Sequence, residues 1–253
     1  MKTSIKLNDI YNIFIGNLNF FIIALLFSFS ALILKVLRWR IVIGIFFSSN
    51  WNFMFLLNLS SISLLLSLVG LSLFLTDGIK SGVLAFREEG MKNKMFMFLT
   101  PYFDRFIGTV AAVLLAFLFF FKNYFILLFF FIIFTFLVIF GWNRDNYRIV
   151  CISLILSFIS HIFDSFSLYL FLNFSLGYKI SFYDWFLAFV LGSFSSLLSI
   201  FGGLGGRAIG MNLILGDQNL KISFILDIIY YLLQLFSAIL GILLFSLNKF
   251  MKK

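Results

Sequence analysis

The chain has very little proline, cysteine, histidine or charge. Pro101, Cys151 and His161 are each the only residue of their type among 253, and charged residues make up 11% of the sequence. A single cysteine excludes an intrachain disulfide, and one cysteine with one histidine excludes a zinc site built from these two residue types. We therefore expect neither a metal nor a cofactor.

Apolar residues, in contrast, make up 62% of the chain and form repeated long runs. A helix crosses a bilayer with about 20 apolar residues, and the alternating pattern of a transmembrane β-barrel is absent. The net charge of +9 comes from Lys and Arg in the loops between these runs, which is typical of a membrane protein. We expect membrane lipids as partners and no nucleic acid.

The apolar runs predict a single integral membrane domain over residues 1–253. The predicted spans are residues 13–34, 53–75, 105–121, 124–141, 149–172, 182–201 and 222–247. The first run is too long for a signal-peptide core and is expected to remain as an anchor, and Pro101 fits the start of the third. The predicted fold class is an all-α polytopic transmembrane bundle of about seven spans, with re-entrant or broken helices in addition.

The stretch "SIFGGLGGRAIG" interrupts an apolar segment with four glycines, which predict a break in the helix: Gly202, Gly203, Gly205 and Gly206. Non-helical backbone at membrane depth requires surrounding protein or a wet cavity. Arg207 follows at the start of a short helix, where it could bind a phosphate. The alternatives are glycine-mediated helix packing and a snorkelling arginine. The distribution of Lys and Arg favours a re-entrant element over 193–216, with both termini cytoplasmic.

A second interrupted segment, "SLFLTDGIKSGVLAFREEG", lies in the first half of the chain. We expect its helix to break at Asp77 and Gly78, with Lys80 one turn later. Asp77 and Lys80 are spaced to form an ion pair or to present a charged rim to a head group. Two glycine-interrupted segments at comparable places in two halves indicate a transporter built from repeats, although the halves share no side-chain identity.

Three further groups of polar residues fall in or beside predicted spans. Asp104 and Arg105 enter the third span, where a charged pair contacts a head group or locks helix packing. His161 and Asp164 are three residues apart and could relay a proton, with Asp227 on a polar face of the last span. The segment Arg38–Arg40 is expected to anchor the first span among head groups.

The motifs "LRWRIVI", "DGIK" with "FREEG", "PYFDRFIG" and "IFGGLGGR" occur in this order. From about residue 30 to residue 245 the chain therefore resembles the lysylphosphatidylglycerol synthase transmembrane region, the flippase-like domain family. The resemblance implies a helical bundle in the cytoplasmic (inner) membrane of a prokaryote, whose relatives translocate an aminoacylated phospholipid. The 253 residues contain no counterpart of the soluble domain that attaches the amino acid in those relatives, so we do not expect lysyl transfer.

Two departures from the family pattern concern the glycine stretch. The family has a proline where this chain has Leu198, and an acidic residue where it has Ala208. Without that carboxylate, Arg207 would have no built-in partner. The arginine is then free to meet a lipid phosphate, or the site has decayed.

The leading hypothesis is a translocase of a phospholipid or lipid-linked head group, a transporter rather than an enzyme. Its expected head-group residues are cations with neighbouring carboxylates: Lys80, Arg105, Arg207, Asp77 and Asp104. An alternative is a membrane glycosyltransferase, or an accessory subunit of cell-envelope biosynthesis enzymes, with Asp77, Glu88 and Glu89 as its only clustered carboxylates. A structural membrane partner without transport is a third.

Overall fold

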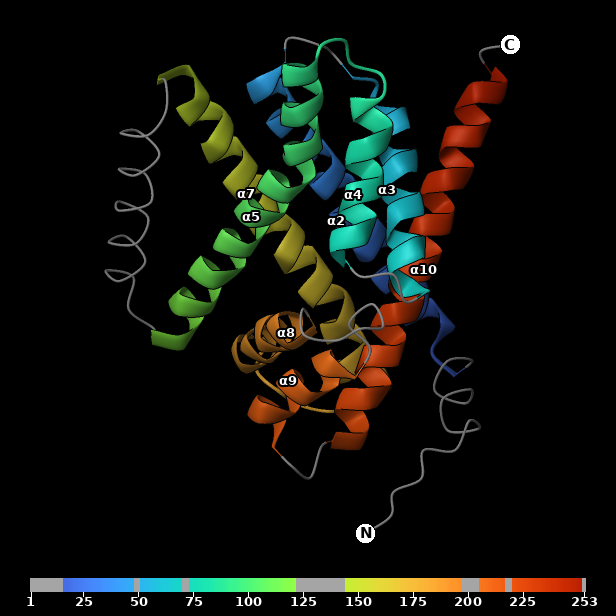
Figure 1. Cartoon of the computed structure of the whole chain (residues 1–253). Helices are drawn as coiled ribbons and strands as arrows, with labels where there is room; N and C mark the ends of the chain where they lie inside the picture. Colours follow the sequence, from blue (N-terminus) through green and yellow to red (C-terminus); the bar gives the residue numbers. More distant parts are fainter. Residues whose placement is uncertain are drawn as a thin grey trace.

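The computed structural model describes residues 16–47, 51–69, 73–121, 144–196, 205–216 and 220–251. Every regular element in these ranges is helical (Figure 1). The elements are α2 (Leu18–Phe46), α3 (Phe53–Leu68), α4 (Leu73–Ala85), α5 (Met91–Phe121), α7 (Arg144–Leu170), the π-helical turn η1 (Phe171–Ser175), α8 (Phe182–Ser196), α9 (Gly206–Leu215) and α10 (Leu220–Met251). The predicted span 124–141 lies outside the described residues.

Four of the described helices are long and apolar enough to cross a membrane. The qualifying stretches lie in α2, α5, α7 and α10: Leu18–Gly44, Met91–Leu115, Arg148–Phe174 and Ile222–Met251. The predicted spans 53–75 and 182–201 instead form α3 and α8, of 16 and 15 residues. Each is shorter than the roughly 20 residues that a crossing needs, so the predicted number of about seven spans is not confirmed.

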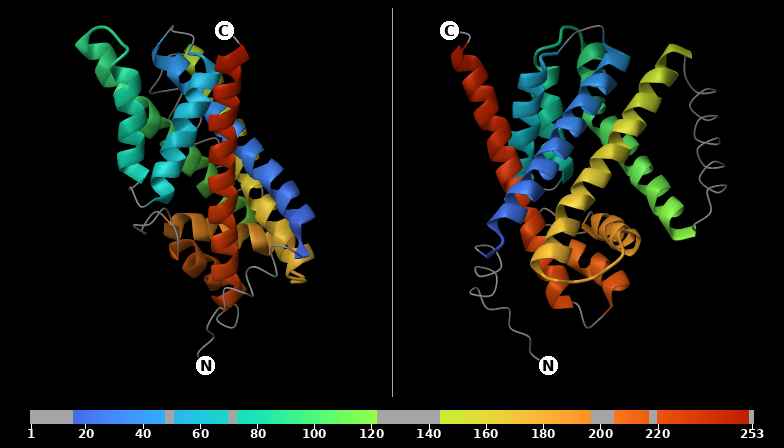
Figure 2. Two further views of the ribbon diagram at one scale, coloured as in Figure 1. Left: turned by 90° about the vertical axis from the view of Figure 1, so that its right-hand side faces the viewer. Right: turned by 180° about the vertical axis from the view of Figure 1, so that it is seen from behind.

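The described helices repeat one order twice: a long helix, two short helices and a second long helix. The first set is α2 to α5 and the second is α7 to α10. Helices α2 and α10 run in one direction through the molecule, and α5 and α7 run in the other (Figures 1 and 2). The short pair α3–α4 lies at the end where α10 finishes, whereas α8–α9 lies at the opposite end. The two sets are therefore inverted relative to each other.

The helix contacts follow the same inverted arrangement. The two first helices, α2 and α7, pack against each other. The short helix α3 packs on α10 as α8 packs on α5, and α4 packs on α5 as α9 packs on α10. If each helix of one set is replaced by its counterpart in the other set, the same list of helix contacts results. This is the spatial relation of an inverted repeat, which side-chain identity did not reveal.

The expected helix break at Asp77 and Gly78 is wrong. Helix α3 ends at Leu68, α4 begins at Leu73, and both residues lie inside α4. A glycine inside a helix costs only about 1 kcal/mol relative to alanine, and Asp77 has cationic partners that compensate its burial. The interruption therefore precedes these residues instead of coinciding with them.

Helix α2 begins at one end of the molecule and α10 finishes at the other (Figure 1). The segment 53–75, which was expected to cross, instead turns back after α3. Residues 1–15 and 122–143 lie outside the described residues, so the expectation that both termini lie on one side stays a prediction.

Pro101 lies within α5 and not at its start. A proline inside a helix removes one backbone hydrogen bond, to the carbonyl four residues earlier, and bends the helix. Here the hydroxyl of Thr100 donates to that carbonyl, Met97 O, at 3.0 Å. Helix α5 changes direction along its length in Figure 1, and the bend brings its middle part toward α2 and α4, both of which it contacts.

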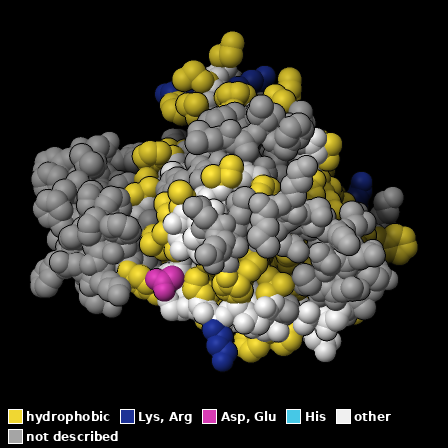
Figure 3. Space-filling model, turned by 90° about the horizontal axis from the view of Figure 1, so that it is seen from below, with side chains coloured by type: hydrophobic (Ala, Val, Ile, Leu, Met, Phe, Trp, Pro, Cys, Tyr) yellow, Lys and Arg dark blue, Asp and Glu magenta, His cyan; other side chains and the backbone are white. Residues whose placement is uncertain are grey.

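Buried apolar side chains form two main clusters, one in each half. The first surrounds Trp39 and Leu57 between α2 and α3, and the second surrounds Phe171 and Trp185 beside α8 and α10. Viewed from below, at the α8–α9 end, the described surface is largely apolar, and the charged side chains visible there are few and separate (Figure 3). The main group of charged side chains lies inside the molecule.

Candidate functional site: a charged cavity

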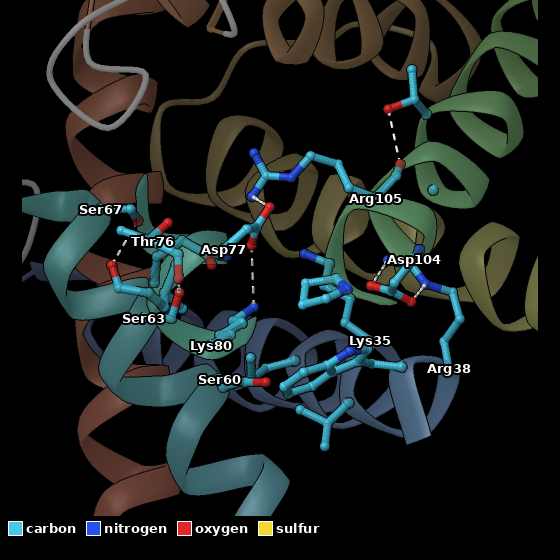
Figure 4. Close-up of a pocket in the computed structure, with 18 of the residues that line it drawn as sticks. Lys35, Arg38, Ser60, Ser63, Ser67, Thr76, Asp77, Lys80, Asp104 and Arg105 are labelled. Carbon is cyan, nitrogen blue, oxygen red and sulfur yellow. Dashed lines mark hydrogen bonds and ion pairs between the residues drawn. The ribbon is translucent and has the colours of Figure 1, made fainter. Parts of the chain in front are cut away.

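A cavity of about 310 Å³ lies between α2, α3, α4 and α5. Helices α7, α8 and α10 contribute one lining residue each: His161, Ser193 and Gln234. Six lining residues carry charged side chains: Lys35, Arg38, Asp77, Lys80, Asp104 and Arg105. Figure 4 shows these side chains converging from three helices. The structure thus brings together four of the five predicted head-group residues and adds Lys35 and Arg38.

Asp77 lies between two cations on the α4 side of the cavity (Figure 4). Arg105 Nη2 is 2.7 Å from Asp77 Oδ2, and Lys80 Nζ is 3.7 Å from Oδ1. The carboxylate is almost fully buried, whereas the side chains of Lys80 and Arg105 are 20% and 28% exposed. Oδ2 accepts no hydrogen bond of good geometry. Two accessible cations therefore share one carboxylate, and neither is fully satisfied by it.

Arg38 and Asp104 form a different kind of pair. Arg38 donates from Nε and Nη2 to the two oxygens of Asp104 at 2.6 and 2.7 Å, and from Nη1 to Ser157 Oγ at 2.8 Å. All three guanidinium nitrogens are thus engaged. A methyl group at Gly108 would lie 2.6 Å from Nη1, so the absence of a side chain there makes room for the arginine. The arrangement joins α2, α5 and α7 rigidly.

The predicted membrane anchor at Arg38–Arg40 is consequently wrong for its first two residues. Arg38 and Trp39 are 6% and 2% exposed, and both line the cavity. The helix continues beyond residue 34 to Phe46, which carries these side chains into the bundle. Asp104 and Arg105 do not pair with each other, because their side chains bind partners on different helices.

Lys35 binds Asp164, a buried carboxylate on α7. The second oxygen of Asp164 accepts a hydrogen bond from Gln234 Nε2 at 3.4 Å, which in turn donates to Ser28 at 3.2 Å. His161 Nε2 instead lies 3.0 Å from the carbonyl oxygen of Gly108. No hydrogen bond between His161 and Asp164 appears in the described part of the chain, so the geometry does not form the predicted relay.

Hydroxyl groups line the α3–α4 side of the cavity (Figure 4). Ser60, Ser63 and Ser67 are spaced so that they fall on one face of α3, and Thr76 on α4 joins them. Ser63 donates to the carbonyl oxygen of Thr76 at 3.1 Å, and Ser67 to that of Leu64 at 2.7 Å. With their hydrogens engaged, these two serines present only acceptor lone pairs to the cavity.

Arg207 lies apart from this cavity. It is 9% exposed, its Nη1 donates to Asp227 Oδ1 at 3.0 Å, and its guanidinium stacks 4.0 Å from the centre of the Tyr230 ring. The expectation that Arg207 lacks a built-in partner is therefore wrong. Ala208 provides no carboxylate, but α10 supplies one from the other side. Asp227 is thereby used in this pair and is no part of a relay with His161.

Gly205, directly before α9, has non-helical backbone. Its φ of +81° is accessible to glycine without strain, and its N–H donates to Asp227 Oδ2 at 2.6 Å. Gly206 is the first residue of α9, whereas Gly202 and Gly203 lie outside the described residues. Glycine also serves packing here, because a methyl group at Gly192 of α8 would lie 2.9 Å from the carbonyl oxygen of Arg207.

The sequence did carry signals for the residues that were missed. Lys35 and Arg38 are one helical turn apart in an apolar run, which is costly unless both face the protein interior. The three α3 serines repeat with helical spacing inside a predicted span. The alternative carboxylates Glu88 and Glu89 follow the end of α4 at Ala85 and do not line the cavity.

Comparison with known proteins adds no assignment. No protein-family model, curated protein or solved structure matches the chain. The resemblance to the flippase-like domain family therefore stays a prediction.

Proposed function

We propose that this protein translocates a phospholipid or lipid-linked head group across the cytoplasmic membrane of a prokaryote, as a multi-pass protein. The single observation that carries the proposal is the charged cavity between α2, α3, α4 and α5, in a molecule whose described part has four helices apolar enough to cross a membrane. Charges at membrane depth are costly and concentrate on transport pathways and binding sites. A cavity lined by cations and hydroxyls offsets the cost of removing a head group from water.

The inverted arrangement of the two helix sets supports transport over a purely structural role. In transporters with inverted repeats, the substrate site lies where the repeats meet and is built from interrupted helices. The cavity lies next to the interrupted pair α3–α4 and also takes residues from α7, α8 and α10 of the second set. Both halves therefore contribute to one site.

The surface beside the cavity suits the tails of a lipid. Leu75 and Phe106 are 52% and 58% exposed. They directly adjoin Thr76 and Arg105 in the sequence, and both of these line the cavity. Apolar side chains exposed to hydrocarbon incur no cost. The tails would remain in the bilayer while the head group passes Lys80 and Arg105. The glycosyltransferase alternative has no comparable support, because Asp77 is used in ion pairs.

The test is lipid movement in vesicles that contain only the purified protein. A phospholipid labelled on one acyl chain, so that its head group is unchanged, is followed by its loss of accessibility to a membrane-impermeant quencher, with and without a proton gradient. The wild-type protein should accelerate exchange between leaflets. Lys80→Met should lower the rate by at least about tenfold, because a hydrogen bond to a charged group contributes about 1.5 to 3 kcal/mol.

The matched control is Lys92→Met, which removes an exposed lysine at the start of α5. This variant should retain the wild-type rate. A Lys80→Met protein that folds and moves lipid at the wild-type rate would contradict the proposal. The proposal would also be contradicted if, with the wild-type protein, every labelled lipid exchanged between leaflets no faster than in empty vesicles.

A further inference from the structure

We infer that the cavity selects a phosphodiester head group with one net negative charge and free hydroxyl groups. It discriminates against phosphomonoesters, which carry more charge, and against head groups with an amine. The inference rests on the proposed function and specifies its substrate class. It follows from the balance of charge, the location of the unbalanced charge and the hydrogen-bonding state of the hydroxyls.

The first step is the charge balance of the described residues around the cavity. Four cations line it, and three carboxylates neutralise them: Asp77 and Asp104 in the lining, and the buried Asp164 behind Lys35. One positive charge is left over. In a medium of low polarity a ligand binds best when it brings the net charge to zero. A phosphodiester carries one negative charge and meets this condition.

The second step locates the unbalanced charge. Arg38 has all three nitrogens engaged, and Lys35 has its own carboxylate. Only Lys80 and Arg105 share a single acceptor, Asp77. In Figure 4 the two side chains approach Asp77 from opposite sides. A phosphate group beside Asp77 would therefore lie near both cations.

The third step concerns the rest of the head group. Ser63 and Ser67 donate their hydrogens to backbone carbonyls and offer only lone pairs to a ligand. A ligand hydroxyl can donate to such an acceptor, so a glycerol or sugar beside the phosphate fits. An amine would also donate, but it would bring a further cation close to Lys80 and Arg105. Of the two carboxylates that line the cavity, Asp77 is already shared and Asp104 is bound by Arg38.

The same balance argues against a phosphomonoester. Its second pKa is near 6, so it carries about −1.5 to −2 at pH 7. Binding would leave negative charge without a partner inside the protein, and such a charge is strongly disfavoured. The cavity is therefore suited to one charge, and the hydroxyl face adds a preference among singly charged head groups.

The experiment compares head groups in the same vesicle assay with wild-type protein. The probes are labelled phosphatidylglycerol, phosphatidylmethanol, phosphatidic acid, phosphatidylethanolamine and lysyl-phosphatidylglycerol. Phosphatidylglycerol should move fastest, at least about tenfold faster than phosphatidic acid or the two amine-bearing lipids. Phosphatidylmethanol, with one charge and no free hydroxyl, should lie between. Equal or faster movement of phosphatidic acid or of either amine-bearing lipid would overturn the inference.

Charge variants then test the cause. Asp77→Asn adds one positive charge and should raise the rate of phosphatidic acid relative to phosphatidylglycerol. Ser63→Ala should slow phosphatidylglycerol but leave phosphatidylmethanol unchanged, and Lys92→Met should preserve every ratio. Unaltered ratios in Asp77→Asn and Ser63→Ala would refute the charge and hydroxyl arguments. Movement of all lipids without selectivity would overturn only this inference, whereas movement of none would remove the proposed function as well.

Discussion

The short helix pairs α3–α4 and α8–α9 occupy equivalent positions in the two halves, but the first borders a cavity and the second is closely packed. Between α3, α4 and their neighbours lies a cavity with hydroxyl and charged side chains. Helices α8 and α9 instead pack without such a space at Gly192, where an added methyl group would lie 2.9 Å from both Arg207 and Met211. Among the described residues, one pair therefore borders an open cavity and the other is closed by direct packing.

Each short pair is also joined to the following long helix by an arginine–aspartate ion pair, which we call a tie. The arginine and the aspartate exchange positions between the two halves. In the first half the carboxylate is on the short helix, as Asp77, and Arg105 is on α5. In the second half Arg207 is on the short helix and Asp227 is on α10. The second tie is much more buried, with side-chain exposures of 10% and 0% against 28% and 3%. The same bond should therefore stabilise the fold in one half and remain available to a ligand in the other.

Breaking the buried tie should have the largest effect on stability. Arg207→Met leaves Asp227 as an unpaired buried charge, which costs about 3 to 5 kcal/mol. The double variant Arg207→Met with Asp227→Asn removes both charges but keeps an oxygen that can accept from the Gly205 N–H, and it should recover most of this loss. Thermal unfolding of the purified proteins in detergent measures both. A double variant as unstable as the single one would show that the charge is not the cause.

Separating the closed pair should have an intermediate effect. Gly192→Val places methyl groups against Arg207 and Met211, and overpacking of this kind costs about 1 to 3 kcal/mol. Gly82→Ala is the matched control, because no atom lies within 4 Å of the position of its added methyl group. The two unfolding temperatures are compared in the same detergent. Equal temperatures would mean that α8 and α9 can move apart freely, contrary to the comparison.

The sequence predicted the all-helical class, non-helical backbone at Gly205 and four of the six charged residues that line the cavity. It failed at Asp77 and Gly78, because local glycine and charge signals there were overridden by Arg105, which lies distant in the sequence. The partner of Arg207 was missed for the same reason, since Asp227 comes from a different helix. Composition and local spacing indicate which residues are out of place in a membrane, but only packing shows which of them compensate each other.

Weakening the exposed tie should have the smallest effect on stability and a large effect on transport. Arg105→Gln removes a pair whose arginine is 28% exposed, and such pairs contribute about 1 kcal/mol or less. Lys80 remains beside Asp77 to limit the loss. The unfolding temperature should therefore stay close to that of the wild type, while lipid exchange falls by at least about tenfold, because a donor to the phosphate is lost. Both are measured on the same preparation. A loss of stability as large as that of Arg207→Met would mean that the two ties are equivalent, and the open half of the molecule would then have no cation to spare for a ligand.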